Sequence, residues 1–446
     1  MLASGIFLSA CSLANPEVRS VVADHSVITS DLPTTSTKLE IAGPAELTLA
    51  HALALALETN PELKSFSYDA RIGEARIIQA GLRPNPELSL IVEDVFGTGS
   101  YSEINQAQST LQLSQIIELG GQRALRTAAA TAVRDQFTDN YEIKRVEVLA
   151  SVTEKFIRAV ADDHLLKLAK RAESLAANAL RNIQIRAEAG GVSELEEIKA
   201  KVLLARAQIA TEHAAHKFEI TKKELSAFWS SDVPTFSKLS ADLFTGFRLP
   251  LFEELESRVN QSLEIRRWVT EKRLREAEQK LAEAKSIPNL LLGAGPRRLE
   301  GSDDESLVFE FSLPLTIFDR NQGLRQEASV LSEKVPLDEQ TARIRLNTAL
   351  FGLYQEMKHA LTEIEAMRAS IIPQAERSLK IAESGYDQGS LSYLDLLDAQ
   401  RTLLEVNREN IEAAYSFHTL LNSIEKLLGA PLERPTQVSK GVTHDE

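Results

Sequence analysis

The chain has 446 residues, with 6% aromatic residues, 20 glycines and 15 prolines, and it is rich in the residue types that favour long helices. Its formal net charge at pH 7 is −14. That charge disfavours nucleic acid as a partner, because binding to phosphates relies on clustered Lys and Arg. No stretch approaches the roughly 18 to 20 consecutive apolar residues of a spanning helix, so any membrane crossing would have to use strands.

The single cysteine, Cys11, ends the run Leu8-Ser9-Ala10-Cys11. This run resembles a bacterial lipoprotein signal, so we expect residues 1–11 to be a signal that ends at an acylated Cys11. Residues 12–44 are polar and would form a tether, and Ser12 after the cysteine suggests sorting to the outer membrane. Residues 1–7 contain no Lys or Arg, which leaves open a start further upstream. An ordinary cysteine near a chain end is the alternative.

After the tether, the sequence contains an internal repeat with two copies. Residues 61–86 align without a gap on residues 263–288, and the same alignment, with small loop differences, later pairs 190–196 with 389–395. Identical pairs within the first match include Glu62 with Glu264, Arg71 with Arg273, Glu74 with Glu276 and Pro86 with Pro288. We therefore predict a first repeat at 45–229, a linker at 230–250, a second repeat at 251–432 and a polar tail at 433–446.

Each copy contains a pair of strands with period-two alternation. One face of the predicted strands is apolar and suits lipid, while the other is polar. Four strands cannot close a transmembrane barrel alone, so the barrel would be shared between chains. A small soluble sheet packed on helices is the alternative. The apolar positions are Leu88, Leu90, Val92, Leu111 and Leu113 in the first copy, and Leu307, Phe309, Phe311, Leu313 and Leu315 in the second.

Very long helices follow the strands. No cluster of Gly or Pro interrupts residues 122–189 or 322–388, and at 1.5 Å per residue each run approaches roughly 100 Å. Leu149, Val152, Phe156 and Val160 have the three-four spacing of a coiled-coil seam. A cytosolic coiled-coil scaffold would explain these helices, but neither the duplicated strand pairs nor the lipoprotein-like start.

Three segments carry a resemblance to a known family: residues 82–88, residues 113–123 and residues 312–323, the last reading SLPLTIFDRNQG. The chain resembles the TolC-type outer-membrane factors over residues 45–432, and within them the outer-membrane components of cobalt-zinc-cadmium resistance-nodulation-division pumps. The resemblance implies a mainly α homotrimer in the outer membrane, whose shared 12-stranded barrel continues into a helical tunnel across the periplasm. It also implies a periplasmic adaptor, an inner-membrane pump and a passive duct for divalent heavy metals. A drug or general exporter of the same fold is the alternative.

The same resemblance assigns roles at the two helix-helix turns, where the adaptor would dock. Asp395 and Asp398 match the family's acidic constriction, Tyr386 matches a gate tyrosine, and Glu196 takes the corresponding place in the first copy. Leu391 stands where some members carry a gate-bridging arginine. Solvated acids on a helix surface are the alternative. The docking residues would be Gly190, Gly191, Val192, Ser193 and Leu195 in one turn, and Gly389, Ser390, Leu391, Ser392 and Leu394 in the other.

No motif for catalysis or cofactor binding is present in the sequence. His213 and His216 have the spacing of a shared helix face and could in principle bind a metal, but a solvated helix surface is the favoured interpretation. We therefore predict no enzyme activity, no cofactor and no resident metal.

Overall fold

The computed structural model describes residues 46–188 and 193–432. These residues belong to one compact unit, Gly43–Glu446. The predicted signal with Cys11, the tether at 12–44 and the tail at 433–446 lie outside the described residues. So do three residues of the first predicted docking turn, Gly190, Gly191 and Val192.

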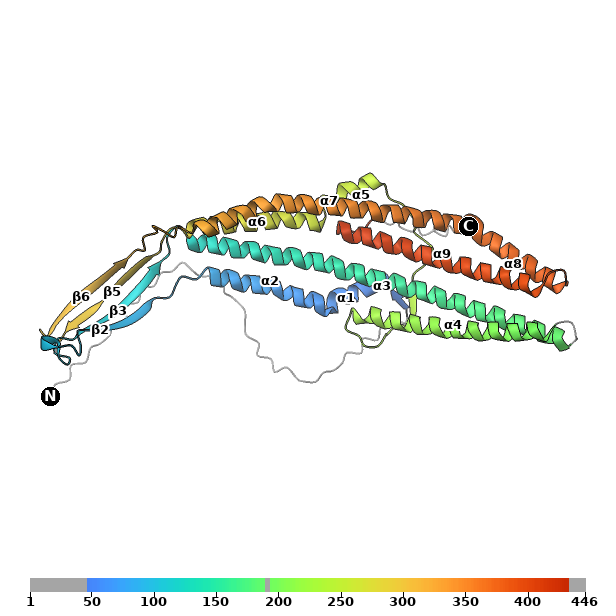
Figure 1. Cartoon of the computed structure of the whole chain (residues 1–446), viewed down its shortest axis with the longest axis horizontal. Coiled ribbons are helices and arrows are strands. Elements are labelled where there is room, and N and C mark those ends of the chain that lie inside the picture. The colour runs from blue at the N-terminus through green and yellow to red at the C-terminus, as the bar shows by residue number, and fades with distance from the viewer. Residues whose placement is uncertain (1–45, 189–192, 433–446) are drawn as a thin grey trace, which may run out of the picture. The chain divides into compact units, whose positions relative to one another are not determined.

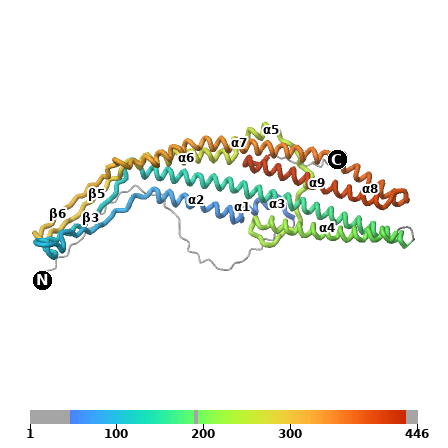
Figure 2. Tube along the Cα trace, viewed as in Figure 1, coloured from blue at the N-terminus to red at the C-terminus, as the bar shows by residue number. Residues whose placement is uncertain are grey.

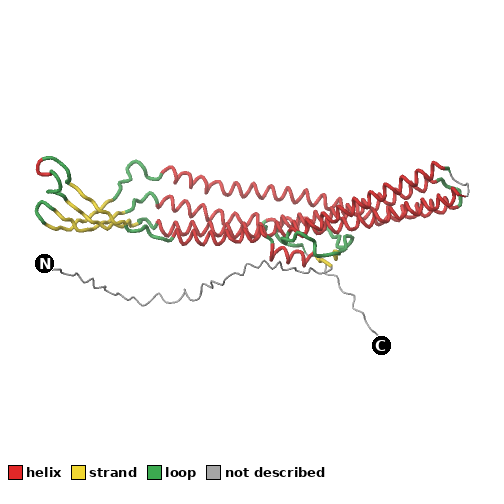
Figure 3. The backbone as a smooth tube through the Cα atoms, turned by 90° about the horizontal axis from the view of Figure 1, so that it is seen from below, coloured by secondary structure: helices red, strands yellow, loops and turns green. Residues whose placement is uncertain are grey.

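Four antiparallel strands form one sheet at one end of the helices (Figures 1 and 3). The order is β2-β3-β5-β6, so β2 and β6 are the edges within this chain. The two strands of each copy are sequence neighbours, and β3 pairs with β5 to join the copies. A short 3-10 turn, η1 (Gly99–Tyr101), lies in the loop after β2. The strands are β2 (Glu87–Glu93), β3 (Gln108–Ile117), β5 (Leu290–Leu299) and β6 (Asp304–Ser312).

The central strand β5 contains residues that strands usually avoid. Pro296 has no N–H to donate to a ladder, and Gly295 lies opposite the backbone of β3, where any side chain would collide with the carbonyl oxygen of Leu111. A side chain at Gly293 would meet the amide of Gln112. The β3–β5 register is the same on both sides of this point, so glycine permits a close approach of the two strands without shifting them.

Helices make up most of the described chain. The longest, α3, has 67 residues and is unbroken, so it is about 100 Å long. It packs against α2, α4, α6 and α9, and so links both copies (Figures 1 and 2). Among the described helices, none is long and apolar enough to cross a membrane. The helices are α1 (Leu49–Thr59), α2 (Pro61–Ala80), α3 (Gln122–Glu188), α4 (Glu194–Ala227), α5 (Phe252–Val259), α6 (Leu263–Ala284), α7 (Gln322–Ala366), α8 (Ile372–Asp387) and α9 (Tyr393–Leu428).

The second long helix differs from the prediction of a continuous run over 322–388. The α7 helix passes through Pro336 without ending, but a π-helical stretch, η2 (Met367–Ile371), separates it from α8. Pro373 in the first turn of α8 explains the change, because it cannot donate to the carbonyl of Ala369 in the preceding turn. The interruption is therefore local, and the axis continues into α8 (Figure 1).

The linker between the copies contains a small element that the sequence did not reveal. Strand β1 (Glu46–Thr48) pairs in parallel with β4 (Lys238–Ser240). Around this pair lies a core of α1, α3, α4 and α9 residues, including the predicted seam residues Val152, Phe156 and Val160. Burial is thus confirmed for these three residues, whereas Leu149, the fourth predicted seam residue, is only partly buried and lies outside this core.

Candidate functional site

The sheet has one strongly apolar face. Register pairs place Leu88 beside Leu113 and Leu90 beside Leu111 on it, and no described part of the chain covers them. The β6 side is as apolar, and Phe309 is 78% exposed. Because soluble monomers rarely expose a contiguous apolar patch of this kind, the face must contact something apolar.

The opposite face of the sheet is polar and internally bonded. Thr110 and Gln112 are buried. The Gln112 amide donates to the Glu310 carboxylate, and Arg297 Nε donates to the Thr110 hydroxyl at 2.9 Å. Arg297 also lies 3.5 Å from the carboxylate of Glu93. One face of the sheet therefore suits an apolar environment, and the other suits water.

At the other end of the helices, the α8–α9 turn is held by its own backbone. The carbonyl of Gly385 accepts from the N–H of Ser390 at 2.8 Å and from that of Leu391 at 3.1 Å. Gly389 has φ of +74°, a conformation that favours glycine. The side chain of Leu391 packs on Gly385, where a Cβ would collide with it. Leu391 thus shapes this turn from within.

The helix after this turn begins with a capping box. The backbone N–H of Asp395 donates to the hydroxyl of Ser392 at 3.3 Å, and the N–H of Ser392 donates to the Asp395 carboxylate at 2.9 Å. The hydroxyl of Ser392 also donates to that carboxylate at 2.6 Å, and the two bonds that the carboxylate accepts from Ser392 lower the pKa of Asp395. Ser193, the equivalent residue before α4, makes no side-chain cap bond. Asp395 therefore has a structural partner that the sequence analysis did not assign.

The side chain of Arg186 on α3 contacts two residues of α8. Arg186 donates to the carbonyl of Tyr386 at 3.1 Å and to the carboxylate of Asp387 at 3.1 Å. Its Cζ lies 4.3 Å from the centroid of the Tyr386 ring. Nothing in the repeat alignment marks Arg186, because its partners lie about 200 positions away and belong to the other copy.

Two buried tyrosines lie side by side at this end. The rings of Tyr386 and Tyr393 are 5.9 Å apart, and neither hydroxyl has a hydrogen-bond partner among the described residues. Burial raises the pKa of Tyr386, and it raises the pKa of Tyr393 to about 12. The negative charge of Glu196 contributes to both pKa shifts. The charge of Glu196 thus acts on Tyr386, although the two predicted gate residues come from opposite copies.

The predicted acids Asp395 and Asp398 border a groove of about 1100 Å³ between α3, α4 and α9. Both are exposed. Its lining includes the aliphatic residues Leu168, Leu203 and Leu394. Along α9 the groove also carries Arg401, Glu405 and Arg408. Leu195 and Leu394, one apolar residue from each predicted docking turn, are both exposed.

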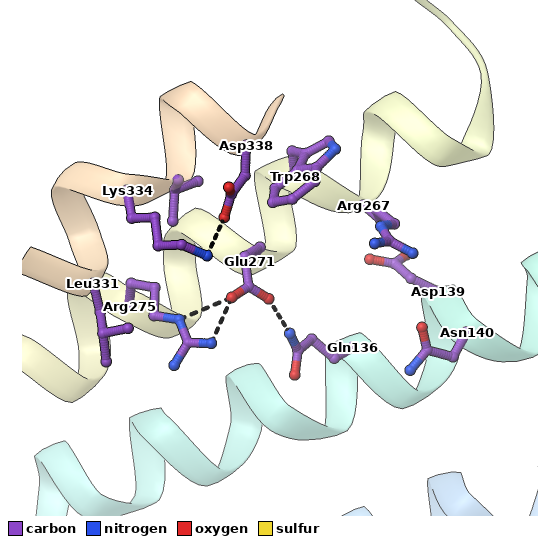
Figure 4. Close-up of a pocket in the computed structure, with 11 residues that line it drawn as sticks. Gln136, Asp139, Asn140, Arg267, Trp268, Glu271, Arg275, Leu331, Lys334 and Asp338 are labelled. Atoms are coloured by element: carbon purple, nitrogen blue, oxygen red, sulfur yellow. Dashed lines mark hydrogen bonds and ion pairs between the residues drawn. The ribbon is translucent and has the colours of Figure 1, made fainter. Parts of the chain in front are cut away.

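A smaller cavity of about 280 Å³ lies between α3, α6 and α7 (Figure 4). Glu271 accepts from Gln136 and from Arg275, and Lys334 pairs with Asp338 at 2.8 Å. Its charged groups are largely paired with one another, which suits a water-filled packing defect.

The two histidines considered as metal ligands, His213 and His216, are exposed on α4. Within residues 46–188 and 193–432, no group of three or more His, Cys, Asp or Glu side chains is placed to hold a metal ion.

Sequence comparison relates the whole described body to known proteins. The cobalt-zinc-cadmium resistance protein CzcC of Cupriavidus metallidurans is 28% identical over 390 residues, which cover 87% of this chain and 91% of CzcC. A crystal structure of a membrane protein from Pseudomonas aeruginosa superposes with a TM-score of 0.73 at 19% identity, covering 87% of this chain and 92% of that one. The open state of the Neisseria gonorrhoeae MtrE outer membrane channel gives a TM-score of 0.69 at 18% identity, covering 87% and 90%.

These superpositions confirm the predicted fold class, a mainly helical chain with a small four-stranded portion. The sequence pattern of outer membrane efflux proteins matches twice, over residues 52–231 and 235–430. The two matches together span most of the chain, which therefore belongs to the outer membrane efflux protein family.

Proposed function

We propose that this chain is the outer-membrane channel subunit of a tripartite efflux pump and acts as a passive duct, without enzyme activity. The uncovered apolar face of the β2-β3-β5-β6 sheet carries the proposal, because it offers lipid a surface while the opposite face keeps its polar groups bonded. Family membership supports the same role. The proposed cargo is divalent heavy-metal cations, on the similarity to CzcC.

The proposed assembly is a homotrimer. The edge strands β2 and β6 have no second partner within the described chain, and an open sheet edge is not tolerated in hydrocarbon. Three chains would join these edges into twelve strands. An exposed apolar stripe runs along α7 at intervals of seven residues. This is the spacing of a seam between packed helices, so the stripe would contact a neighbouring chain of the trimer. Its members are Val330, Leu337, Ile344 and Phe351.

The far end of the helices is the proposed docking site for a periplasmic adaptor, which would link the duct to an inner-membrane resistance-nodulation-division pump. Exposed Leu195 and Leu394 would be its apolar contacts.

The same end is the proposed constriction. Three copies of Asp395 and Asp398 around an axis would favour cations over anions. Asp395 serves its capping box with one carboxylate oxygen and remains exposed, so its charge stays available. Tyr386 and Glu196 are the proposed gate residues, and Arg186 supports this proposal by linking Tyr386 to α3. The proposed location is the outer membrane, with lipid attached at Cys11, and this anchor can be tested by palmitate labelling of wild type against Cys11→Ala.

Complementation tests the proposed function. A strain lacking its own metal efflux duct would receive this chain together with a cognate pump and adaptor, and cellular cobalt, zinc and cadmium would be measured. Reduced accumulation is expected with wild type. Purified protein in detergent should have the mass of a trimer and should conduct ions in planar bilayers. A stable, non-conducting monomer would refute the channel, and conductance with protection against drugs instead of metals would refute the cargo.

A further inference from the structure

The junction between α7 and α8 is the one described place where a long helix leaves α-helical geometry. The stretch η2 (Met367–Ile371) is π-helical, and π-helical turns in otherwise regular helices often mark functional positions. Pro373 follows at once and removes a backbone donor. Resistance to bending should therefore be lowest at this junction.

Separate hydrophobic cores lie on the two sides of the junction. Before it, Met357 and Ile364 of α7 pack in a core with Phe417 of the second half of α9. After it, Leu379 of α8 packs in a different core with Leu403 of the first half of α9. Because no buried cluster spans η2, the α8 end can move while the core around α7 remains packed.

One side chain of η2 ties the junction to the linker between the copies. The Cζ of Arg368 lies 5.6 Å from the ring centroid of Phe244 and 5.0 Å from that of Phe247. Arg368 also donates to the carbonyl oxygen of Phe244. Its guanidinium thus combines two cation–π contacts with a hydrogen bond. A lysine could keep the charge but not the planar stacking.

The two aromatic rings are themselves fixed to other helices. The ring of Phe244 meets the ring of His164 on α3 edge-on at 5.2 Å. The ring of Phe247 meets that of Phe417 on α9 edge-on at 5.1 Å. Arg368 therefore connects the deformable η2 stretch to α3 and α9, which both continue past the junction toward the tip.

We propose that η2 is the pivot on which α8 moves when the tip opens, and that Arg368 restrains this pivot through Phe244 and Phe247. This inference rests on the proposed channel function, and it assigns regulation of that channel to a position outside the tip. Loss of the Arg368 contacts should release α8 without unfolding the core around α7.

The test uses full-length protein in detergent and in planar bilayers. Arg368→Ala should raise hydrogen exchange of backbone amides in 372–387 several-fold, leave 346–364 unchanged, and increase channel conductance several-fold. Arg368→Lys should lie between Arg368→Ala and wild type. Arg345→Ala removes an exposed charge from α7 and serves as the matched control, with wild-type exchange and conductance.

Phe244→Leu provides an independent test of the Arg368 restraint, because it removes the aromatic ring that Arg368 contacts and keeps an apolar side chain. It should reproduce part of the Arg368→Ala effect and add little in the double variant. Wild-type exchange in 372–387 for Arg368→Ala would overturn the inference, as would an equal rise in 346–364, which indicates general destabilisation. If the wild-type protein does not conduct, the proposed channel function is wrong. The hydrogen-exchange results for 372–387 would then still test whether Arg368 restrains α8.

Discussion

The guanidinium of Arg186 lies over the ring of Tyr386, with Cζ 4.3 Å from the ring centroid, and it donates a 3.1 Å hydrogen bond to the Tyr386 carbonyl. The two residues come from α3 and α8, which belong to different copies of the duplicated plan. They join the two helix pairs of one chain near the tip. Leu391 stands where a bridging arginine was expected by resemblance, and Arg186 provides a bridge from the opposite side.

Arg186→Ala should therefore favour the open tip. Loss of a partly exposed cation–π contact and ion pair is worth about 1 kcal/mol, which corresponds to roughly a fivefold shift between closed and open states. Conductance in planar bilayers measures the change. Arg181→Ala, an exposed arginine on the same helix, should behave as wild type. Unchanged conductance in Arg186→Ala would show that this bridge does not restrain the tip.

Block by a polyvalent cation tests the acidic constriction. Cobalt hexammine added on the periplasmic side should reduce wild-type conductance, because three copies of each acid would concentrate negative charge around the pore. Asp395→Asn with Asp398→Asn should weaken the block at least tenfold. Asn at 395 retains an oxygen that can accept from the Ser392 amide, so the cap should survive. Glu196→Gln, in the first copy, should affect the block less. A double variant blocked as strongly as wild type would place the selectivity elsewhere.

Removal of a single hydroxyl tests the cap of α9. Ser392→Ala should lower the free energy of unfolding of the tip by about 1 kcal/mol, since Ser392 accepts from the Asp395 amide. It should also raise the pKa of Asp395 toward its usual value, because the hydroxyl is the main cause of the lowering. Ser193→Ala is the matched control, because Ser193 makes no side-chain cap bond. Hydrogen exchange in the first turns of α4 and α9 measures both, and equal effects would argue against a specific cap.

The tyrosine pair predicts a loss of stability at high pH. Burial raises the pKa of Tyr393 to about 12 in the folded protein, whereas an unfolded tyrosine titrates near pH 10. Folded protein therefore holds this proton more tightly, and stability should fall as the pH rises from about 10 to 12. Absorbance of phenolate should show late ionisation, and Tyr393→Phe should remove that late step and the associated loss of stability. Ionisation of every tyrosine near pH 10 would contradict the burial.

The sequence predicted the elements that have strong local periodicity. Alternation located the strand pairs, and the absence of breakers located α3 almost to its last residue. In each case, the sequence pattern lies within the residues of the element that it predicts.

Other features depend on contacts between distant segments, and local patterns could not reveal them. The β1–β4 pair has only three residues in each strand and joins segments about 190 positions apart. Arg186 finds Tyr386 only when both helix pairs are packed. Pro373 accounts for the missing backbone donor after η2, but only the structure shows that the preceding residues take up π-helical geometry. Ser193 and Ser392 hold equivalent positions before α4 and α9, yet only Ser392 makes a side-chain cap bond.

Because α3 is unbroken, the number of its residues fixes the direction in which side chains at its tip end point, relative to the sheet at its other end. One residue inserted between β3 and Arg186 would rotate the end of α3 by about 100° and turn Arg186 away from Tyr386. A seven-residue insertion would restore the direction to within about 20° and lengthen the helix by roughly 10 Å. The span of this chain can therefore change only in steps close to whole helical turns, such as seven or eleven residues, made together in α3 and in the helices that pack on it.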